Sequence, residues 1–384
     1  MTRLLICCGD PSGDLYGSML VRELSKKNPS LRVDAVGGPM IRDAIGTRGR
    51  LLFDLASLGI TGFIEPLRKL ATFARVEREL DRRMREDRPD ALICIDFYGF
   101  NRRVLSRARA AGVPAYYFVS PQVWASRPGR VKTLKSLVRR MLVIFPFERE
   151  LYERAGIPVS WVGHPLLDIL PPPRTSREPR SLSIGLLPGS RPSEIRRHLA
   201  LFCKAADRIL KDFPDTTLRL FTAPHMRDAD YQPWISEAFG PRGARIETVR
   251  ESDYTERSRL DFAITCSGTA TLENALLGIP MVVVYRLSWP TYFLARALIR
   301  VPHIAMANLL AGKELVPELI QRNAVPKRLA ETCLDLLGRP KRLEALRDDL
   351  IALRSTLGGP GACERAAKIL LDDLAPRPSK MAAA

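Results

Sequence analysis

Short apolar runs alternate with amphipathic segments along most of the chain. The runs at 4–8, 91–95, 115–119, 262–266 and 281–285 have the length and composition of strands buried on both faces of a parallel sheet. Each run is followed by a polar loop and then by a segment with helical spacing, about 10–15 residues long. This alternation predicts an α/β fold built from doubly wound parallel sheets.

A stiff, polar, proline-rich segment at 171–179 divides this pattern into two halves. Near the C-terminus, glycines at 358–361 separate two further helical segments. We therefore expect a first domain at 1–170, a linker at 171–180, a second domain at 181–340, C-terminal helices at 341–375 and a disordered tail at 376–384.

The composition fits a globular protein with 384 residues, which is enough for two α/β domains. No apolar run approaches the roughly 18–20 uncharged residues that span a bilayer. The N-terminus leads directly into a strand, without the features of a signal peptide, so we expect a cytoplasmic protein. Seven cysteines without CxxC spacing indicate neither disulfides nor zinc.

The charge balance is strongly basic, with 60 Lys and Arg against 42 Asp and Glu, a net charge of +18. Such a surface suits nucleic acid, an anionic membrane or phosphorylated substrates, and it also occurs as an ordinary solvated surface in an Arg-rich proteome. The chain lacks zinc-finger spacing, an aromatic RNP-type strand and a basic tail, which argues against nucleic acid. The basic stretch at 126–140, next to Trp124, is a candidate membrane surface.

The segment at 261–286 reads as strand, polar turn, helix, short turn and strand. Its turn, Ser267-Gly268-Thr269, opens a helix whose unpaired N–H groups and positive dipole end can bind a phosphate. Glu273 follows one helical turn later, where its carboxylate can accept hydrogen bonds from ribose hydroxyls. The alternative, an ordinary structural helix cap, carries equal weight at this point.

Other loops at the carboxyl ends of predicted strands supply further candidates, because ligands bind at that edge of parallel sheets. An Arg beside a Gly-Ser turn, in Gly189-Ser190-Arg191, can hold a diphosphate. Asp96 directly follows a buried strand, so partial desolvation would raise its pKa toward that of a general base; a helix N-cap is the alternative. Loops that suit sugar hydroxyls contain Asp10, Ser12, Gly13 and Asp14, and Ser120, Gln122 and Trp124.

Taken together and in order, the motifs of these loops resemble those of the lipid-A-disaccharide synthase family, from residue 4 to about residue 370. The motifs are GDPSGD (9–14), IDFYGFN (95–101), SPQVWA (120–125), VGHP (162–165), LLPGSR (186–191) with Glu194, SGTATLE (267–273), PMVVVYR (280–286) and NLLAGKELVPELIQ (308–321).

The resemblance implies a GT-B glycosyltransferase, with two Rossmann-like domains that face each other across a cleft and C-terminal helices that cross back to the first domain. It implies that UDP-2,3-diacylglucosamine donates its sugar to the 6-hydroxyl of 2,3-diacylglucosamine 1-phosphate. The products are a β-1′,6-linked disaccharide and UDP, formed with inversion. A homodimer is also suggested by the resemblance.

The family's site residues carry over where the motifs match. Asp96 corresponds to the base that deprotonates the acceptor, and Arg191 to the arginine that neutralises the diphosphate. The UDP site would include Gly189, Ser190, Ser267, Gly268, Thr269, Glu273 and Asn308. We expect no cofactor and no metal, since Arg191 and a helix N-terminus can stabilise the leaving group and no Asp-x-Asp pair lies near these loops.

Three positions depart from the family pattern: Asp10 stands where Glu is usual, Gly99 where a second acid is common, and Ser126 where a second Trp is usual. These differences concern the acceptor side. The family acts at the inner membrane surface, and the segments 58–67 and 288–294 are candidates for contact with an anionic membrane. The alternatives are another UDP-sugar enzyme, such as an epimerase, and a non-enzymatic nucleotide or nucleic-acid binder.

Overall fold

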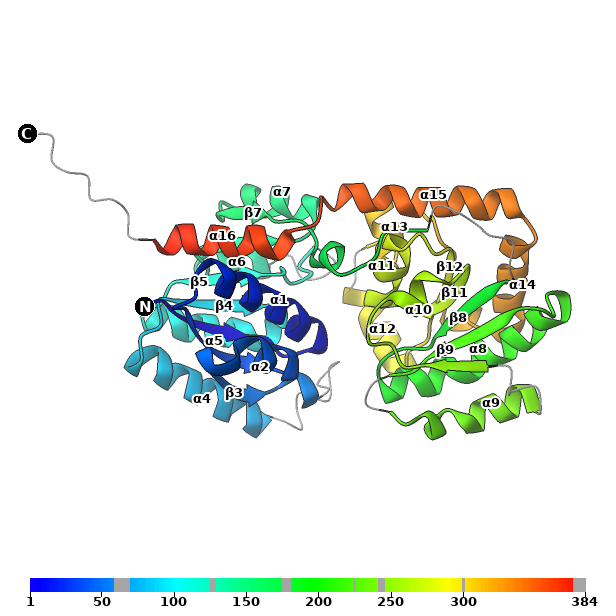
Figure 1. Ribbon diagram of the computed structural model, residues 1–384, viewed down its shortest axis with the longest axis horizontal. Coiled ribbons are helices and arrows are strands. Elements are labelled where there is room, and N and C mark those ends of the chain that lie inside the picture. Colours follow the sequence, from blue (N-terminus) through cyan, green and yellow to red (C-terminus); the bar gives the residue numbers. More distant parts are fainter. Residues whose placement is uncertain are drawn as a thin grey trace, which may run out of the picture. The chain divides into compact units, whose positions relative to one another are not determined.

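The computed structural model describes residues 1–58, 70–124, 129–174, 181–223, 226–240, 246–298 and 301–375. The chain forms two compact units (Figure 1). The first unit consists of Met1–Asp168 and Leu357–Ala384, and the second unit of Ile169–Thr356. The predicted tail at 376–384 lies outside the described residues.

The first unit is built on a seven-stranded sheet whose strands pair in parallel, as the apolar runs predicted. The strand order is β3-β2-β1-β4-β5-β6-β7. It reverses between β1 and β4, and ligands bind outside the carboxyl ends of the strands at such a switch point. The strands are β1 (Arg3–Cys7), β2 (Arg32–Gly37), β3 (Gly49–Asp54), β4 (Ala91–Ile95), β5 (Ala115–Phe118), β6 (Arg140–Val143) and β7 (Val159–Trp161).

Helices pack on this sheet through apolar faces. In α4, for example, the buried residues Phe73, Val76, Leu80 and Met84 recur at helical spacing and join a core with strand residues of β1 and β4. All seven cysteines of the chain are free and buried. The helices of this unit are α1 (Pro11–Lys27), α2 (Pro39–Ile45), α4 (Leu70–Glu86), α5 (Tyr98–Ala110), α6 (Arg130–Lys135), α7 (Pro146–Arg154) and α16 (Ala362–Leu374).

The second unit repeats this plan with a six-stranded parallel sheet in the order β10-β9-β8-β11-β12-β13. The strands are β8 (Ser183–Leu187), β9 (Thr217–Phe221), β10 (Ile246–Val249), β11 (Phe262–Cys266), β12 (Met281–Tyr285) and β13 (Glu318–Ile320). The helices are α8 (Pro192–Asp212), α9 (Gln232–Phe239), α10 (Thr255–Ser258), α11 (Thr269–Leu276), α12 (Trp289–Leu298), α13 (Met306–Ala311), α14 (Pro326–Leu337) and α15 (Pro340–Thr356).

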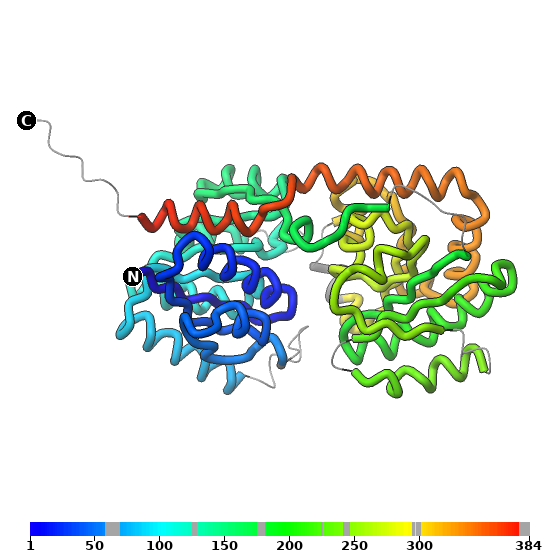
Figure 2. The backbone as a smooth tube through the Cα atoms, viewed as in Figure 1, coloured from blue at the N-terminus to red at the C-terminus, as the bar shows by residue number. Residues whose placement is uncertain are grey.

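The C-terminal segment is divided between the units, as the trace in Figure 2 shows. Helix α15 belongs to the second unit, whereas the sequence grouped it with α16 as a helix that returns to the first domain. Only α16 packs in the first unit, alongside α1 (Figure 1). The Asp168 carboxylate caps α16 by accepting hydrogen bonds from the N–H groups of Gly361, Ala362 and Cys363.

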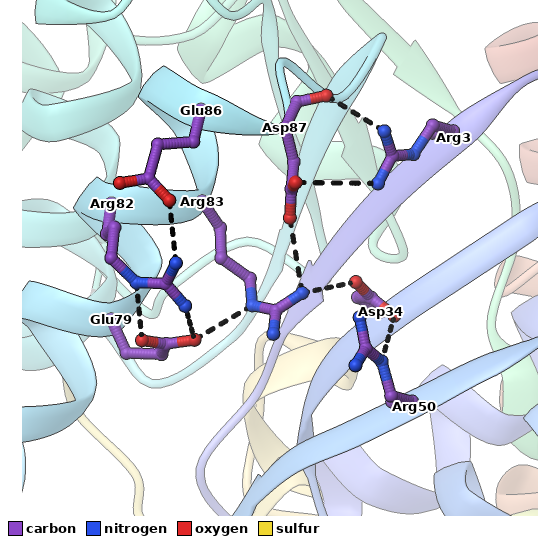
Figure 3. A network of polar contacts seen from close by, with 8 residues as sticks. All are labelled: Arg3, Asp34, Arg50, Glu79, Arg82, Arg83, Glu86 and Asp87. Atoms are coloured by element: carbon purple, nitrogen blue, oxygen red, sulfur yellow. Dashed lines mark hydrogen bonds and ion pairs between the residues drawn. The ribbon is translucent and has the colours of Figure 1, made fainter.

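An ionic network lies at the amino ends of the first unit's strands (Figure 3). Its centre is Arg83, whose side chain is only 12% exposed. The Arg83 guanidinium lies 3.0 Å from Asp34, 2.9 Å from Glu79 and 3.2 Å from Asp87. The full network comprises Arg3, Asp34, Arg50, Glu79, Arg82, Arg83, Glu86 and Asp87. Because the arginines here are matched by carboxylates, this edge is a poor anion site.

Candidate active-site loops at the strand ends

The predicted loops of the first unit lie together at the carboxyl edge of its sheet. Strands β1, β4 and β5 are neighbours, so the loops that follow them meet at this edge. These loops carry the Asp10 group, Asp96 and Ser120. The sequence prediction that they form one site in this unit is consistent with the topology.

Asp96 follows β4 in an unusual backbone conformation. Its φ is +42° and that of Phe97 is +47°, in the left-handed region that non-glycine residues rarely adopt. Two buried side chains hold this turn: Asn101 Nδ2 donates to the Asp96 carbonyl at 2.8 Å, and Tyr117 Oη donates to it at 2.5 Å. Such strain costs on the order of 1–3 kcal/mol and typically clusters at functional sites. The N-cap of α5 is Phe97, without a side-chain cap hydrogen bond, so the alternative that Asp96 caps this helix is wrong.

The pKa of Asp96 is raised to about 7. Burial is the main cause, because the charged carboxylate loses water, and the negative charges of Asp10 and Glu148 add to it. A backbone hydrogen bond from Phe97 acts in the opposite direction. A carboxyl group with a pKa near 7 is well matched to general base catalysis at neutral pH.

In the first loop, from Asp10 to Asp14, the two carboxylates cap helices. Asp10 accepts a hydrogen bond from the Gly13 N–H at 2.7 Å and caps α1, while Ser12 is partly exposed beside it. Asp14 is 3% exposed and accepts from the N–H groups of Gly38 (2.8 Å), Met40 (3.0 Å) and Ile41 (3.1 Å). The Asp14 carboxylate thus caps α2, and the predicted sugar contact stays a prediction.

The loop after β5 contacts Glu148, a residue that was not predicted from the sequence. Trp124 Nε1 donates to Glu148 Oε1 at 3.2 Å, and the Phe145 N–H donates to Glu148 Oε2 at 3.2 Å. Glu148 is 1% exposed, and burial raises its pKa to about 7. The only sequence signal was its place in the first turn of α7, directly after a strand. Glu148 fixes Trp124 and adds a second buried carboxyl to this edge.

The other members of this loop differ in exposure. Ser120 is buried, with its Oγ 2.7 Å from Tyr152 Oη, whereas Gln122 is exposed. Trp124 packs edge-on against Phe147, which is 38% exposed, with ring centroids 5.1 Å apart. Ser120 therefore has a structural role, and Gln122 and Trp124 are the members of this loop that a ligand can reach.

His164, in the Val-Gly-His-Pro motif, is part of the fold. It is 2% exposed, and its Nδ1 accepts a hydrogen bond from the Leu166 N–H at 3.1 Å. Burial lowers its pKa to about 3, so the ring is neutral at physiological pH. Its ring packs against Phe145 and Tyr16. These contacts give His164 a structural role.

In the second unit, the Gly189 turn leads from β8 into α8. Gly189 has a φ of +120°, and a Cβ at this position would lie 2.8 Å from the Glu194 Cβ, so the turn requires glycine. Ser190 and Arg191 follow at the exposed end of the turn. Arg191 Nη1 lies 2.9 Å from Glu194 Oε1, and the Arg191 side chain is 46% exposed. Its guanidinium is oriented by Glu194 and remains accessible to an anion.

The Ser267-Gly268-Thr269 turn leads from β11 into α11. Gly268 and Thr269 are exposed, and α11 begins at Thr269, so the N–H groups of Thr269 and Ala270 lie at the sheet edge. The N–H group of Thr271 donates to the Gly268 carbonyl at 3.0 Å. Ser267 Oγ donates to the Ile304 carbonyl at 3.1 Å, and Thr271 Oγ1 donates to the Gly268 carbonyl at 2.8 Å. These bonds fix the turn in the form that the sequence predicted for a phosphate site.

Glu273 is held by side chains from the neighbouring segment. It forms an ion pair with Arg257 and accepts a hydrogen bond from Tyr254 Oη at 3.1 Å. Arg257 is 8% exposed and also pairs with Glu251, whose pKa burial raises to about 7. The sequence did not identify Arg257 or Tyr254, because their contact with Glu273 depends on the tertiary fold. The network fixes the Glu273 carboxylate one turn beyond the phosphate turn.

Asn308, predicted for the UDP site, lies inside the second unit. It is fully buried, and its amide uses all of its hydrogen-bonding capacity within the protein. Nδ2 donates to the Val316 carbonyl and to Glu318, at 2.9 and 2.8 Å, and Oδ1 accepts from the N–H groups of Leu315 and Val316, at 2.8 and 2.9 Å. Asn308 therefore holds the segment that precedes β13 in place, and its place in the UDP site stays a prediction.

In the parts of the chain that the structure describes, no group of three or more His, Cys, Asp or Glu is arranged to hold a metal ion. No helix in those parts is long and apolar enough to cross a bilayer. The arrangement consists of a carboxylate edge in one unit and a phosphate-type edge in the other.

Two parallel-sheet units with such edges define a GT-B protein, the class of glycosyltransferases and related UDP-sugar enzymes. Solved structures agree on this fold. A Staphylococcus aureus MnaA–UDP structure matches with a TM-score of 0.67 and 13% identity over 100% of both chains. Acinetobacter baumannii MurG matches with a TM-score of 0.60 and 14% identity, over 97% of this chain and 100% of that chain.

Sequence comparison gives the family. The family model for lipid-A-disaccharide synthetase matches residues 4–372. Curated lipid-A-disaccharide synthases from Syntrophus aciditrophicus and Geobacter sulfurreducens are each 39% identical to this chain, over 96% and 97% of its length and 97% of theirs. The chain belongs to the lipid-A-disaccharide synthase family. It is a glycosyltransferase that forms the lipid A disaccharide, which confirms the activity predicted from the motifs.

Proposed function

We propose that the protein transfers 2,3-diacylglucosamine from UDP to the 6-hydroxyl of 2,3-diacylglucosamine 1-phosphate, with inversion, and that Asp96 is the base. The observation that carries this proposal is the Asp96 carboxyl group, which is held at the end of β4 in a strained turn with its pKa raised to about 7. Family membership supports the substrates.

The chemistry follows from the charges at the two edges. Asp96 accepts the proton of the acceptor hydroxyl as that oxygen bonds to the anomeric carbon of the donor. The bond from this carbon to the diphosphate breaks, and UDP leaves with the electron pair. Arg191 and the first N–H groups of α11 lie at the edge where that developing charge would be stabilised.

The roles in the donor site are proposals of the same kind. Gly189, Ser190, Ser267, Gly268 and Thr269 would surround the diphosphate with backbone N–H and hydroxyl donors. Glu273, fixed by Arg257 and Tyr254, would accept hydrogen bonds from the ribose. In the first unit, Asp10, Ser12, Gly13, Gln122 and Trp124 would contact the acceptor or the transferred sugar.

Mass spectrometry of reactions with the two lipid substrates tests the proposed activity. The wild type should yield the disaccharide 1-phosphate and UDP only when both lipids are present. The Asp96→Asn variant should yield neither, whereas Asp43→Asn, a change of the same charge at an exposed position of α2, should behave as the wild type. Disaccharide formation by Asp96→Asn at the wild-type rate would refute the assignment of the base.

The same experiment separates the alternative function. Solved structures of similar fold include a UDP-GlcNAc 2-epimerase from Neisseria meningitidis and the glycosyltransferase CalG4, so the fold alone does not decide the reaction. An epimerase would convert the donor sugar without any acceptor lipid. Its product has the same mass as the donor, so liquid chromatography before the mass measurement is needed to separate the two. Donor conversion without acceptor would favour the epimerase.

We further propose that the protein is cytoplasmic and binds peripherally to the anionic surface of the inner membrane. Helix α12 exposes Trp289 (46%) and Phe293 (61%), and the Arg322 guanidinium lies 5.5 Å from the Trp289 ring centre. Aromatic rings beside cations are typical of membrane interfaces. Of the other candidates, the segment at 58–67 lies outside the described residues from position 59 onward, and so do residues 126–128 of the basic stretch at 126–140. The remainder of that stretch includes helix α6.

Vesicle sedimentation tests the membrane proposal. The protein should pellet with vesicles that contain anionic lipid and be released at high salt, because screening weakens the attraction between charges. Trp289→Ser with Phe293→Ser should reduce the bound fraction. Indifference of the wild type to both lipid charge and salt would contradict the proposal. The homodimer suggested by the family stays a prediction, which sedimentation velocity without vesicles can test.

A further inference from the structure

A buried histidine connects two strand ends in the second unit. His198, in α8, is fully buried. Its Nδ1 lies 3.2 Å from the Pro188 carbonyl oxygen, and its Nε2 accepts a hydrogen bond from the Arg286 N–H at 3.0 Å. The ring stacks against Phe202 and Tyr285, with centroids 5.9 and 6.0 Å apart.

The partners of His198 define its protonation state. The Arg286 N–H is a donor, so Nε2 must be the acceptor, and the proton must lie on Nδ1, from which it is donated to Pro188. Only the neutral ring can make both bonds. Burial lowers the pKa of His198 to about 4, so this neutral form persists at physiological pH.

The two residues to which His198 is hydrogen-bonded, Pro188 and Arg286, lie on either side of the Ser267-Gly268-Thr269 turn. Pro188 directly precedes Gly189-Ser190-Arg191, and Arg286 directly follows β12. In the sheet, β11 lies between β8 and β12, and β11 leads into the Ser267 turn. Two arginines, Arg191 and Arg286, therefore leave the strands that flank this turn.

The two arginines differ in their partners. Arg191 is paired with Glu194, so together they add no net charge to the edge. Arg286 is exposed, and its side chain has no ion pair with any residue that the structure describes. A nucleoside diphosphate carries more than one negative charge at neutral pH, and a single arginine that shares a carboxylate compensates it poorly. A second cation on the opposite side of the turn would provide that compensation.

We propose that Arg286 is a second cation for the diphosphate of the nucleotide, and that His198 is the positioning residue that fixes its strand end. The inference rests on the proposed UDP site and adds two residues to it. The buried bonds of His198 set the backbone of Arg286 relative to the Gly189 turn. The ligand class is a nucleoside diphosphate, bound on both sides of the Ser267 turn.

Calorimetric titration with UDP tests the role of Arg286. Arg286→Gln should weaken UDP binding roughly tenfold or more, Arg286→Lys should lie between it and the wild type, and the salt dependence should decrease. The matched control is Arg208→Gln, an exposed arginine further along α8, which should bind as the wild type does. Equal affinities of Arg286→Gln and Arg208→Gln would overturn the inference, whereas a wild type that fails to bind UDP would overturn the proposed function instead.

A double-variant cycle tests the role of His198. His198→Phe keeps a ring between Phe202 and Tyr285 but removes both hydrogen bonds, so it should weaken UDP binding, and His198→Gln, which can donate and accept, should restore part of the loss. If His198 acts through Arg286, His198→Phe should cost little further affinity in an Arg286→Gln background. Losses that simply add, or equal affinities of the Phe and Gln variants, would refute the positioning role.

Discussion

The carboxyl edges of the two sheets share one topology and carry opposite chemistry. In the first unit, carboxyl groups lie near one another: the charges of Asp10 and Glu148 both raise the pKa of Asp96. In the second unit, the carboxylates are matched within the protein, Glu194 by Arg191 and Glu273 by Arg257. The first arrangement favours taking up a proton, and the second favours binding an anion.

The two units therefore show that the same sheet edge can serve different chemistry, depending on the side chains in its loops. The backbone shows the same contrast. In the first unit the strained turn is occupied by Asp96 and Phe97, which need Asn101 and Tyr117 to hold them. In the second unit, the turn that follows β8 contains Gly189, which adopts its positive φ without strain. The proposed base thus lies in a turn of positive φ that contains no glycine.

The largest expected effect comes from removing the base. Asp96→Asn should lower kcat by about 10²–10⁴-fold, because the acceptor hydroxyl loses its proton acceptor. Asn tolerates the left-handed backbone, so the turn should be kept. The affinity for UDP, measured by calorimetry, should stay that of the wild type. A loss of UDP binding in this variant would mean that the two edges do not have separate roles.

Removing the diphosphate arginine should give the converse result. Arg191→Gln should lower kcat/KM by about 10²-fold and weaken UDP binding, because the leaving group loses a charge-assisted partner. The rate that remains should still depend on pH as in the wild type, since Asp96 is untouched. Unchanged UDP affinity would contradict the assignment of Arg191, and Arg208→Gln serves as the control for net charge.

A smaller effect should follow when Glu148 is made neutral. The charge of Glu148 raises the pKa of Asp96, so Glu148→Gln should lower that pKa and move the acidic limb of the pH–rate profile to lower pH. The amide can still accept the hydrogen bond from Trp124. A limb that moves to higher pH, or does not move, would show that the carboxylates do not interact as described.

The smallest effect on activity is expected for Asp14. Because its carboxylate caps α2, Asp14→Ala should lower the free energy of unfolding by about 1–2 kcal/mol, measured by urea denaturation. The kcat and KM of the folded enzyme should change little. A large rise in the KM for the acceptor lipid without a loss of stability would support the sugar contact predicted from the sequence.

Local signals allowed much of this to be predicted. The buried strands, the Gly189 turn and the Ser267 turn are each encoded by consecutive residues, so the sheets and the family could be predicted from the sequence. Asp14 and Asn308 were predicted as ligand contacts because a polar residue in a strand-end loop suits either role. Only the tertiary structure shows that their hydrogen-bonding groups are already used by the fold.

Residues that act across long sequence separations could not be predicted. Glu148 meets Trp124, Arg257 meets Glu273, and His198 meets Arg286 only when the chain has folded. Glu148, Arg257 and His198 are buried polar groups. Burial shifts the pKa of Glu148 and of His198, and the hydrogen bonds or ion pairs of all three residues fix the position of their partners.

The dependence of kcat on pH, with both lipid substrates saturating, tests the central claim about Asp96 most directly. If a carboxyl group with a pKa raised to about 7 is the base, kcat should rise with pH through about 7, because only the ionised form accepts the proton. It should then reach a plateau. A kcat that is constant between about pH 5 and 9 would contradict the account.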